Sequence, residues 1–416
     1  MVVSIGPYHH SKRDLMEMEK LKIEFARNYI PDSNEEMYKT AINASEARKF
    51  YSDGSVPSEF DNDEKFSKMM FLDACFILHF ISCFLGGNGT GMKPHLEGFV
   101  IRDLLLLENQ LPFSVLEVVM NLRKRYPKKE EECVCTSEKI KEFVAKVRHS
   151  PITDEQDSRK PVGKNICTKW NEMFGKVTSF CFRQSKPKTL DVENVIDPNK
   201  SPLHLVELFH SRFTQRNPNP NPNSSSANKG KGWYCYRSAK ELRNVGIHFK
   251  PSKTSNFTDV KYSSYFLYGY LSLPPIVIDD LSKSLLLNLV AYESCSSTTN
   301  NAFQISSYIV FMDSLIDEPE DVKELRSKGI LLNSLGSDQE VSDLFNQISK
   351  FLVLHPNAFS EVRRGIDERY QNKIKKWMAE WLNDHFNSPW TILAFGGATF
   401  ALVLTAIQTY VSVFPS

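Results

Sequence analysis

The sequence predicts a mainly α protein, in which a large helical body with a small β-hairpin is followed by one C-terminal transmembrane helix. Three observations predict this fold class. Helix-capping residues precede apolar residues at helical spacing in several places, one stretch at 260–279 gathers aromatic and β-branched residues around a turn, and residues 390–414 contain no Asp, Glu, Lys or Arg.

Length and composition are those of an ordinary globular protein. The chain of 416 residues is long enough to bury a sizeable core, and 24% of its residues are charged. The formal net charge of +1 provides no basic excess for binding nucleic acid. The eight cysteines form no C-x-x-C pair, and Cys133 and Cys135 have no matching His or Cys cluster that would complete a zinc site. This usage favours a reducing compartment, and no secretory signal is visible.

The N-terminal half of the body contains a long apolar run at Met69–Leu85. Asp73 near its start and His79 in its middle disfavour a membrane span, because a central carboxylate costs about 2.5–3.5 kcal/mol on insertion scales. We therefore expect the central core helix of the body here. Asp73 then needs a buried partner, which the sequence does not identify.

A low-complexity segment divides the body. Residues 216–232 are rich in Pro, Asn and Ser and have little to bury, so we expect a flexible surface linker there and a shorter loop near 128–132. The expected organisation is an N-terminal half at 1–215, the linker at 216–232, a C-terminal half at 233–385 and the transmembrane helix at 390–414.

Helix signals dominate the C-terminal half. Ser238 and Glu241 form a capping box, and Gly246 ends that short helix. Acidic residues surround Pro319, which is typical of a proline in the first turn of a helix. A second capping box starts at Ser337 and is followed by apolar residues at helical spacing: Val341, Leu344, Phe345, Ile348 and Leu352.

Two further features of this half are less regular. The strand candidate lies at 260–279, with a turn expected near Gly269. Closer to the C-terminus, a helical stripe lies either in the membrane interface or against the core of the protein; it consists of Ile366, Tyr370, Ile374, Trp377 and Trp381.

The transmembrane prediction rests on the uncharged run Trp390–Phe414. About 25 residues at 1.5 Å each are enough to cross roughly 30 Å of hydrocarbon. Trp390 at one end, with Tyr410 and Phe414 at the other, are typical of interfacial anchors. A buried core helix is the alternative. Basic residues precede the run at Lys373, Lys375 and Lys376, so the positive-inside tendency predicts a cytosolic body on the plasma membrane or the endoplasmic reticulum.

One face of this segment carries small and polar residues. At 100° per residue, the face contains Ala394, Gly397, Ala398, Ala401, Thr405 and Gln408. Small residues at that spacing let two helices approach closely, and Gln408 can hydrogen-bond across the contact. We predict self-association or pairing with another membrane helix; ordinary small-residue content of a membrane span is the alternative.

Several stretches together resemble the plant "domain of unknown function 247" family. In order they are Val3–His10, Leu72–Leu78, Arg102–Phe113, Ser238–Phe249, Leu271–Asp280, Asn288–Cys295, Ser306–Ile330 and Phe386–Gly397. The resemblance covers nearly the whole chain. It implies a land-plant protein, usually membrane-associated, without an agreed biochemical activity, and a genetic link of some relatives to grass self-incompatibility suggests recognition or signalling. Relatives generally carry a further stretch before the Val3–His10 motif, so the resemblance implies a shortened N-terminus here.

The function predicted from these features is interaction or recognition at a membrane. The expected partners are the lipid bilayer and another protein or a second copy of the chain, and no cofactor is expected. The alternative is a hydrolase acting on membrane lipid. The sequence has no G-x-S-x-G, H-E-x-x-H or kinase signature, and the glycine-rich loop at 86–93 departs from the P-loop pattern. Two weaker possibilities are a catalytic Glu108 paired with Asp73 and a metal site at His9 and His10. Neither has further support in the sequence, so catalytic and metal residues are not assigned.

Overall fold

The computed structural model describes residues 1–10, 12–30, 35–52, 54, 56–86, 91–125, 134–148, 201–214, 237–266, 268–295, 303–352, 358–371 and 389–413. The predicted linker at 216–232 and the predicted loop at 128–132 lie outside these residues. The described chain is mainly helical, as predicted, and it groups into two compact units. Unit 1 is Met1–Pro220 with Val277–Ser306, and unit 2 is Asn221–Ile276 with Ser307–Ser416.

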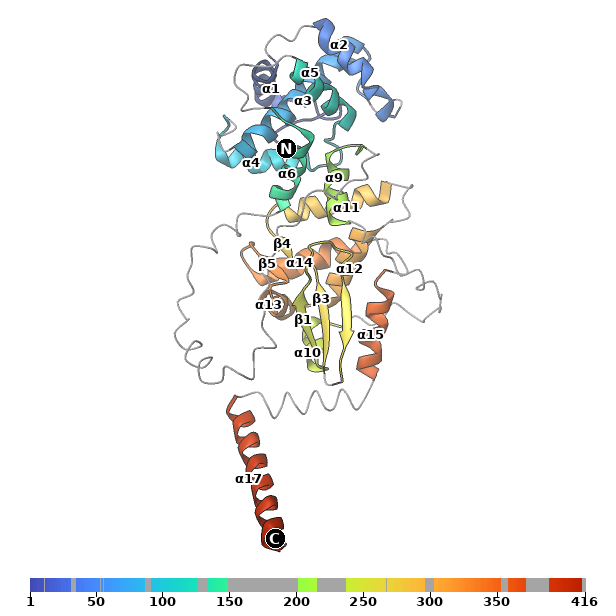
Figure 1. The fold of residues 1–416 in the computed structure, drawn as a ribbon. Coiled ribbons are helices and arrows are strands. Elements are labelled where there is room, and N and C mark those ends of the chain that lie inside the picture. The colour runs from blue at the N-terminus through green and yellow to red at the C-terminus, as the bar shows by residue number, and fades with distance from the viewer. Residues whose placement is uncertain are drawn as a thin grey trace. The chain divides into compact units, whose positions relative to one another are not determined.

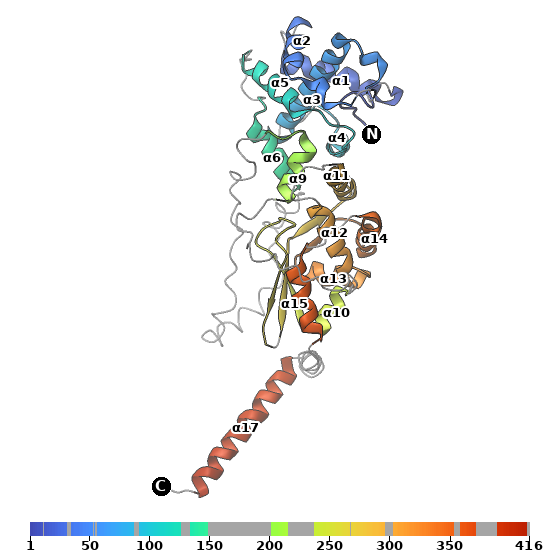
Figure 2. The same ribbon diagram turned by 90° about the vertical axis from the view of Figure 1, so that its right-hand side faces the viewer.

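Unit 1 is an assembly of helices (Figures 1 and 2). Its longer helices are α1 (Met16–Tyr29), α2 (Glu35–Ala44), α3 (Asp63–Gly86), α4 (Pro94–Leu104), α5 (Phe113–Arg125), α6 (Ser137–Arg148), α9 (Leu205–Phe213) and α11 (Ser282–Cys295). Short 3₁₀ turns lie at Arg13–Leu15, Ala47–Phe50 and Ser58–Phe60.

Helix α3 is the core helix that the apolar run at 69–85 predicts. Helices α1, α2, α5 and α6 all pack against it. Phe76 stacks on Phe25 of α1 at 5.5 Å between ring centroids and on Phe80 at 6.2 Å. Among the described residues α3 is long and apolar enough to cross a membrane, but 72% of its apolar window is buried inside the protein. It therefore functions as the centre of the hydrophobic core.

Unit 2 contains a three-stranded sheet in the order β1-β3-β2. Strand β1 (Ile247–Pro251) runs parallel to β3 (Gly269–Leu273), and β2 (Lys261–Ser264) runs antiparallel to it. The predicted hairpin is therefore present, but β2 ends at Ser264 and Gly269 already begins β3, so the turn precedes Gly269. Strand β1 was not predicted. A separate two-stranded sheet pairs β4 (Ile276–Ile278) with β5 (Leu331–Asn333). Strands of three residues are too short to show a clear alternation of apolar and polar residues in the sequence.

The helices of unit 2 begin where the capping residues predict. The Ser238 side chain accepts the N–H of Glu241 at the start of α10 (Ala239–Asn244). The Ser337 side chain accepts the N–H of Glu340 at the start of α14 (Asp338–Ile348). Pro319 is the first residue of α13 (Pro319–Ser327). Leu352 follows a 3₁₀ turn instead of extending α14. The other helices are α12 (Gln304–Leu315), α15 (Ser360–Gln371) and α17 (Pro389–Val413).

Helix α15 packs on strand β2. A Cβ atom at Gly365 would lie only 2.4 Å from Cδ1 of Tyr262, so the absence of a side chain at Gly365 lets the helix approach the strand. Ile366 is buried, and the guanidinium of Arg237 lies 3.7 Å from the ring centre of Tyr370. These two members of the helical stripe pack on the body of the protein, while its other three members lie outside the described residues.

Candidate functional site

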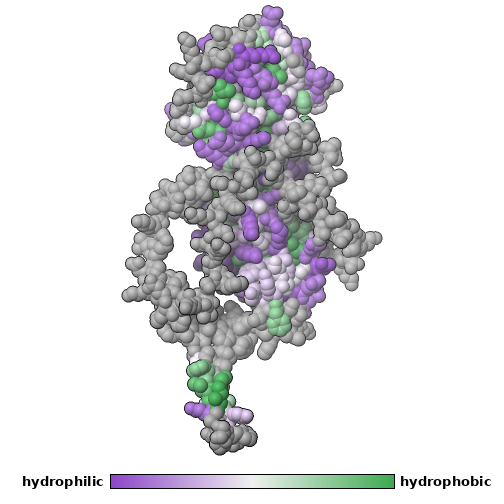
Figure 3. All heavy atoms as spheres, viewed as in Figure 1, coloured by the Kyte–Doolittle hydropathy of each residue, from purple (hydrophilic) through white to green (hydrophobic). Residues whose placement is uncertain are grey.

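Helix α17 contains all six residues of the predicted helix-pairing face. It has 25 residues, and its described apolar side chains are between 44% and 72% exposed: Phe400, Leu402, Val403, Leu404, Ile407 and Tyr410. Figure 3 shows this segment as a mainly hydrophobic surface. The part of α17 whose side chains are described, Phe400–Tyr410, is a short apolar helical segment.

Gly397 in α17 faces open space, because an added Cβ would meet no atom within 4 Å. Ala398, Ala401, Thr405 and Gln408 on the same face are exposed. The hydroxyl of Thr405 donates to the carbonyl of Ala401 at 2.8 Å and is satisfied within the helix. The pairing role of this face remains a prediction. The side chain at Ala394, its sixth member, lies outside the described residues.

The N-terminal segment Val2–Gly6 is bound through its backbone by buried polar side chains. A carboxylate oxygen of Asp103 accepts the N–H groups of Val2 and Val3. Asn109 accepts the N–H of Ile5 at 2.6 Å and donates to the carbonyl of Val3 at 3.2 Å. Asp103 and Asn109 are at most 1% exposed. Two motifs that are far apart in the sequence, Val3–His10 and Arg102–Phe113, thus form one structural element.

Side chains of Asn109 and Gln110 cap carbonyl groups at the end of α4. Gln110 Nε2 donates to the carbonyl of Leu104 at 2.7 Å and to that of Leu106 at 2.8 Å, and Asn109 Nδ2 donates to the carbonyl of Asp103 at 2.9 Å. The groups left free at the helix terminus are therefore satisfied. Glu108 takes no part in these caps.

The buried partner of Asp73 is Lys22. Lys22 Nζ lies 2.6 Å from a carboxylate oxygen of Asp73 and 2.6 Å from one of Glu19, and it also donates to the carbonyl of Ser4. The second oxygen of Asp73 accepts the N–H of Gly6 at 2.8 Å. Burial raises the pKa of Asp73, and the ammonium of Lys22 opposes that rise. Each atom of the pair has a partner, which indicates a structural ion pair that fixes the N-terminal segment.

Glu108 and Asp73 have different partners in the structure. Glu108 lies 3.2 Å from His9, and its side chain is 63% exposed, whereas Asp73 is engaged by Lys22. His10 Nδ1 lies 3.6 Å from a carboxylate oxygen of Glu19. Within the described ranges, no three His, Cys, Asp or Glu side chains are arranged to hold a metal ion.

A hydroxyl, an imidazole and a carboxylate lie in series at Thr214, His210 and Glu293. Thr214 Oγ1 is 3.4 Å from His210 Nδ1, and His210 Nε2 is 3.1 Å from Glu293 Oε1. The threonine is 8% exposed, and its hydroxyl donates to the carbonyl of His210 at 2.9 Å. Glu293 accepts the N–H groups of Ile305 at 2.7 Å and Ser306 at 2.9 Å. The group therefore caps the start of α12 and leaves no hydroxyl ready to attack a substrate.

A thiol also lies near a histidine, on α3. Cys83 Sγ is 3.6 Å from His79 Nε2, one helical turn away, and the ring of Phe25 lies 4.7 Å from the His79 ring. Cys83 is 6% exposed. This pair belongs to the packed core around α3.

Sequence reasoning missed the Lys22 and Glu293 interactions. Each joins residues from separate helices or joins a helix to a distant loop, and no local spacing marks either one. The resemblance did mark the segments Leu72–Leu78 and Asn288–Cys295, in which Asp73 and Glu293 lie.

Comparison with known proteins gives a family and no activity. DUF247, a plant protein of unknown function, matches residues 1–404. UPF0481 protein At3g47200 of Arabidopsis thaliana is 27% identical over 99% of this chain and 82% of its own length. Putative UPF0481 protein At3g02645 of the same plant is 22% identical over 100% of this chain and 87% of its own length. No solved structure matches the chain.

Proposed function

We propose that this chain, which belongs to the plant family DUF247 of unknown function, is a tail-anchored membrane protein. Its helical body would recognise a protein partner from the cytosol. Helix α17 would anchor it, and no catalytic step is assigned to the body. The observation that carries the proposal is the exposure of an uncharged, apolar helix.

Water is an unfavourable surrounding for this helix. At about 25 cal/mol per Å², each large apolar side chain gains roughly 1.5–3 kcal/mol on leaving water. Phe400, Leu402 and Ile407 are each at least half exposed, at 66%, 72% and 54%. The hydroxyls of Thr405 and Thr409 donate to carbonyls within the helix at 2.8 Å, which lowers the cost of placing them in hydrocarbon.

The flanking charges support a cytosolic body. Lys373, Lys375 and Lys376 precede α17 in the sequence. Positive charge favours the cytosolic side of a membrane. The buried thiols of Cys75, Cys83 and Cys135, which form no disulfide bonds, suit a reducing compartment as well.

Anchoring and orientation can be tested together by mapping glycosylation. A glycosylation acceptor sequence added after Ser416 should be modified in endoplasmic reticulum membranes, while the acceptor triplets at Asn43, Asn88, Asn223 and Asn256 should stay unmodified. Replacing Leu402 with Arg should abolish the modification, because the charge blocks insertion. The matched replacement of Leu402 with Ile should leave it unchanged. Modification at Asn43 would instead place the body in the lumen.

From the small-residue face we propose that α17 pairs with another helix within the membrane. Gly397 is the smallest residue on this face, and a leucine there would separate two closely packed helices. We expect Gly397→Leu to weaken association of the full chain in a membrane energy-transfer assay, and Val403→Leu, away from the face, to leave it unchanged. Equal association in both variants would eliminate this face as the contact.

Partner recognition is tested by proximity labelling in plant membranes. The full chain should label a reproducible set of proteins that is lost when the body is replaced by an unrelated soluble domain fused to 389–416. If the fusion labels the same proteins, location alone determines the neighbours, and the recognition role is wrong.

A further inference from the structure

The turn between β2 and β3 exposes aromatic side chains. Phe266 is 75% exposed, Tyr265 51% and Tyr268 40%. Figure 3 shows a small hydrophobic spot beside a pale, weakly hydrophilic area at this end of the sheet. Monomeric proteins rarely leave neighbouring large aromatic residues in water unless they contact something.

Contacts among Tyr265, Tyr268 and Tyr270 hold the described part of the aromatic turn. Tyr265 N–H donates to the carbonyl of Tyr268 at 2.8 Å and closes the turn. The ring of Tyr268 lies 5.2 Å from that of Tyr265 and 5.3 Å from that of Tyr270. The tyrosine rings support one another, so little conformational freedom would be lost if the turn met another surface.

Helix α15 holds this turn near its own C-terminal end. Arg369, two residues before the helix ends at Gln371, donates to the carbonyls of Tyr265 at 3.2 Å and Val245 at 3.0 Å. Figures 1 and 2 both show the β2–β3 turn at the same end of the sheet as the end of α15. The aromatic turn therefore lies where the chain leaves the sheet towards α17. The intervening residues 372–388 can span at most about 60 Å when fully extended.

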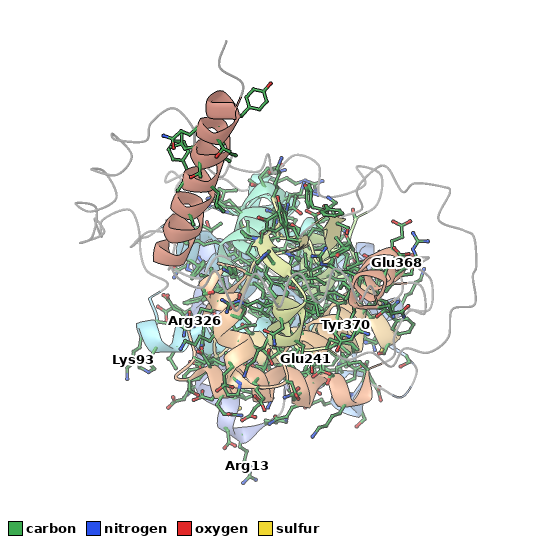
Figure 4. All side chains as sticks on the ribbon, turned by 90° about the horizontal axis from the view of Figure 1, so that it is seen from below. Arg13, Lys93, Glu241, Arg326, Glu368 and Tyr370 are labelled. Carbon is green, nitrogen blue, oxygen red and sulfur yellow. The ribbon has the colours of Figure 1, made fainter. Side chains whose placement is uncertain are left out.

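Two exposed basic side chains near the turn, Arg243 and Lys328, share one acidic partner, Glu324, at 3.1 Å and 3.9 Å. Burial lowers the pKa of His248, whose ring lies 6.2 Å from that of Tyr268, and the nearby Lys328, Arg243 and Arg369 lower it further, with Glu324 opposing them. The side chains of Arg243 and Lys328 are 56% and 40% exposed. Figure 4 looks onto this end of unit 2 and also shows two labelled acids, Glu241 on α10 and Glu368 on α15. Glu368 lies 3.7 Å from Arg364.

We propose that the aromatic side chains of this turn, Tyr265, Phe266 and Tyr268, insert into the interface of the membrane that α17 occupies, next to anionic lipid head groups. Tyrosine and phenylalanine are suited to this depth, because their rings are apolar and the tyrosine hydroxyl stays in the hydrated layer. Arg243 and Lys328 would meet the lipid phosphates and carboxylates. The inference rests on the proposed anchoring by α17.

The test uses the full chain in vesicles of phosphatidylcholine and phosphatidylserine. The photoreactive residue benzoylphenylalanine replaces Phe266, Phe50 or Tyr410 in separate preparations. Phe50 is a matched control in unit 1, because it is an exposed aromatic at 51%. After illumination, lipid adducts are quantified by mass spectrometry. We expect adducts at 266 and 410 and none above background at 50.

The outcomes separate this inference from the proposed anchor. Adducts at 410 without adducts at 266, adducts to protein only at 266, or equal adducts at 266 and 50 would each overturn the inference and leave the anchor intact. No lipid adduct at 410 would overturn the anchor and the inference with it.

The charge contribution has its own readout. Arg243→Gln and Lys328→Gln should each lower the adduct yield at 266 about fivefold in vesicles that contain phosphatidylserine. Neither change should alter the yield in pure phosphatidylcholine. An unchanged yield in both lipids would contradict the role of anionic lipid.

Discussion

Replacing Lys22 with Met tests the buried ion pair most sharply. The methionine keeps a similar volume, but Asp73 loses its counter-charge while it remains 0% exposed. Removing one partner of a buried pair costs about 3–5 kcal/mol, because the other charge stays buried without compensation. Asp73 keeps only the Gly6 N–H at 2.8 Å among the contacts of its carboxylate described above.

The loss should depend on pH. Burial already raises the pKa of Asp73, and removing the opposing ammonium raises it further. The folded variant then holds a proton that the unfolded chain releases. Its stability is therefore greatest below the ordinary aspartate range and falls as the pH rises through the raised pKa, by up to about 1.4 kcal/mol per pH unit.

The assay is hydrogen exchange of the α3 amides in the full chain held in detergent micelles. A loss of about 3–5 kcal/mol corresponds to exchange that is faster by about 10²–10⁴-fold if these amides exchange by opening of unit 1. Lys20→Met, at an exposed position of α1, is the control and should change exchange little. In the double variant Lys22→Met with Asp73→Asn, the pH dependence should disappear. If Lys22→Met exchanges like the wild type at neutral pH, the ion pair does not hold this core.

Three further changes test other contacts by the same exchange measurement. Asn109→Ala removes the partners of Ile5 and Val3 and should destabilise the N-terminal segment by about 3 kcal/mol; unchanged protection there would contradict the backbone contacts. Glu293→Gln turns a donor towards backbone N–H groups and should loosen the first turn of α12 by about 2 kcal/mol, with the rest of α12 as the internal reference. Gly365→Ala should cost about 1–3 kcal/mol through its clash with Tyr262, whereas Gly98→Ala, which meets open space in α4, should gain about 1 kcal/mol; equal effects would refute the close approach of α15 to β2.

The helices could be predicted from the sequence because their signals are local. Ser238, Pro319 and Ser337 mark helix starts through contacts within one turn, and the apolar run at 69–85 is long enough to indicate a core helix. Strand β1 was missed because its pairing with β3 is parallel and its partner lies beyond the intervening β2.

The polar contacts within unit 1 could not be predicted for a related reason. Asp73 required a buried partner on physical grounds, yet Lys22 lies 51 positions away on another helix and looks like an ordinary charged residue of an amphipathic helix. The aromatic turn is readable as residues, but its exposure depends on how α15 and Arg369 hold it. Local patterns report spacing along one element, and these contacts join several elements.

The central claim is that lipid surrounds α17, and extraction of plant membranes with alkaline carbonate tests it most directly. We expect the full chain to stay with the membrane pellet and a chain ending before Pro389 to be released into the supernatant. Release of the full chain by carbonate would contradict the anchor.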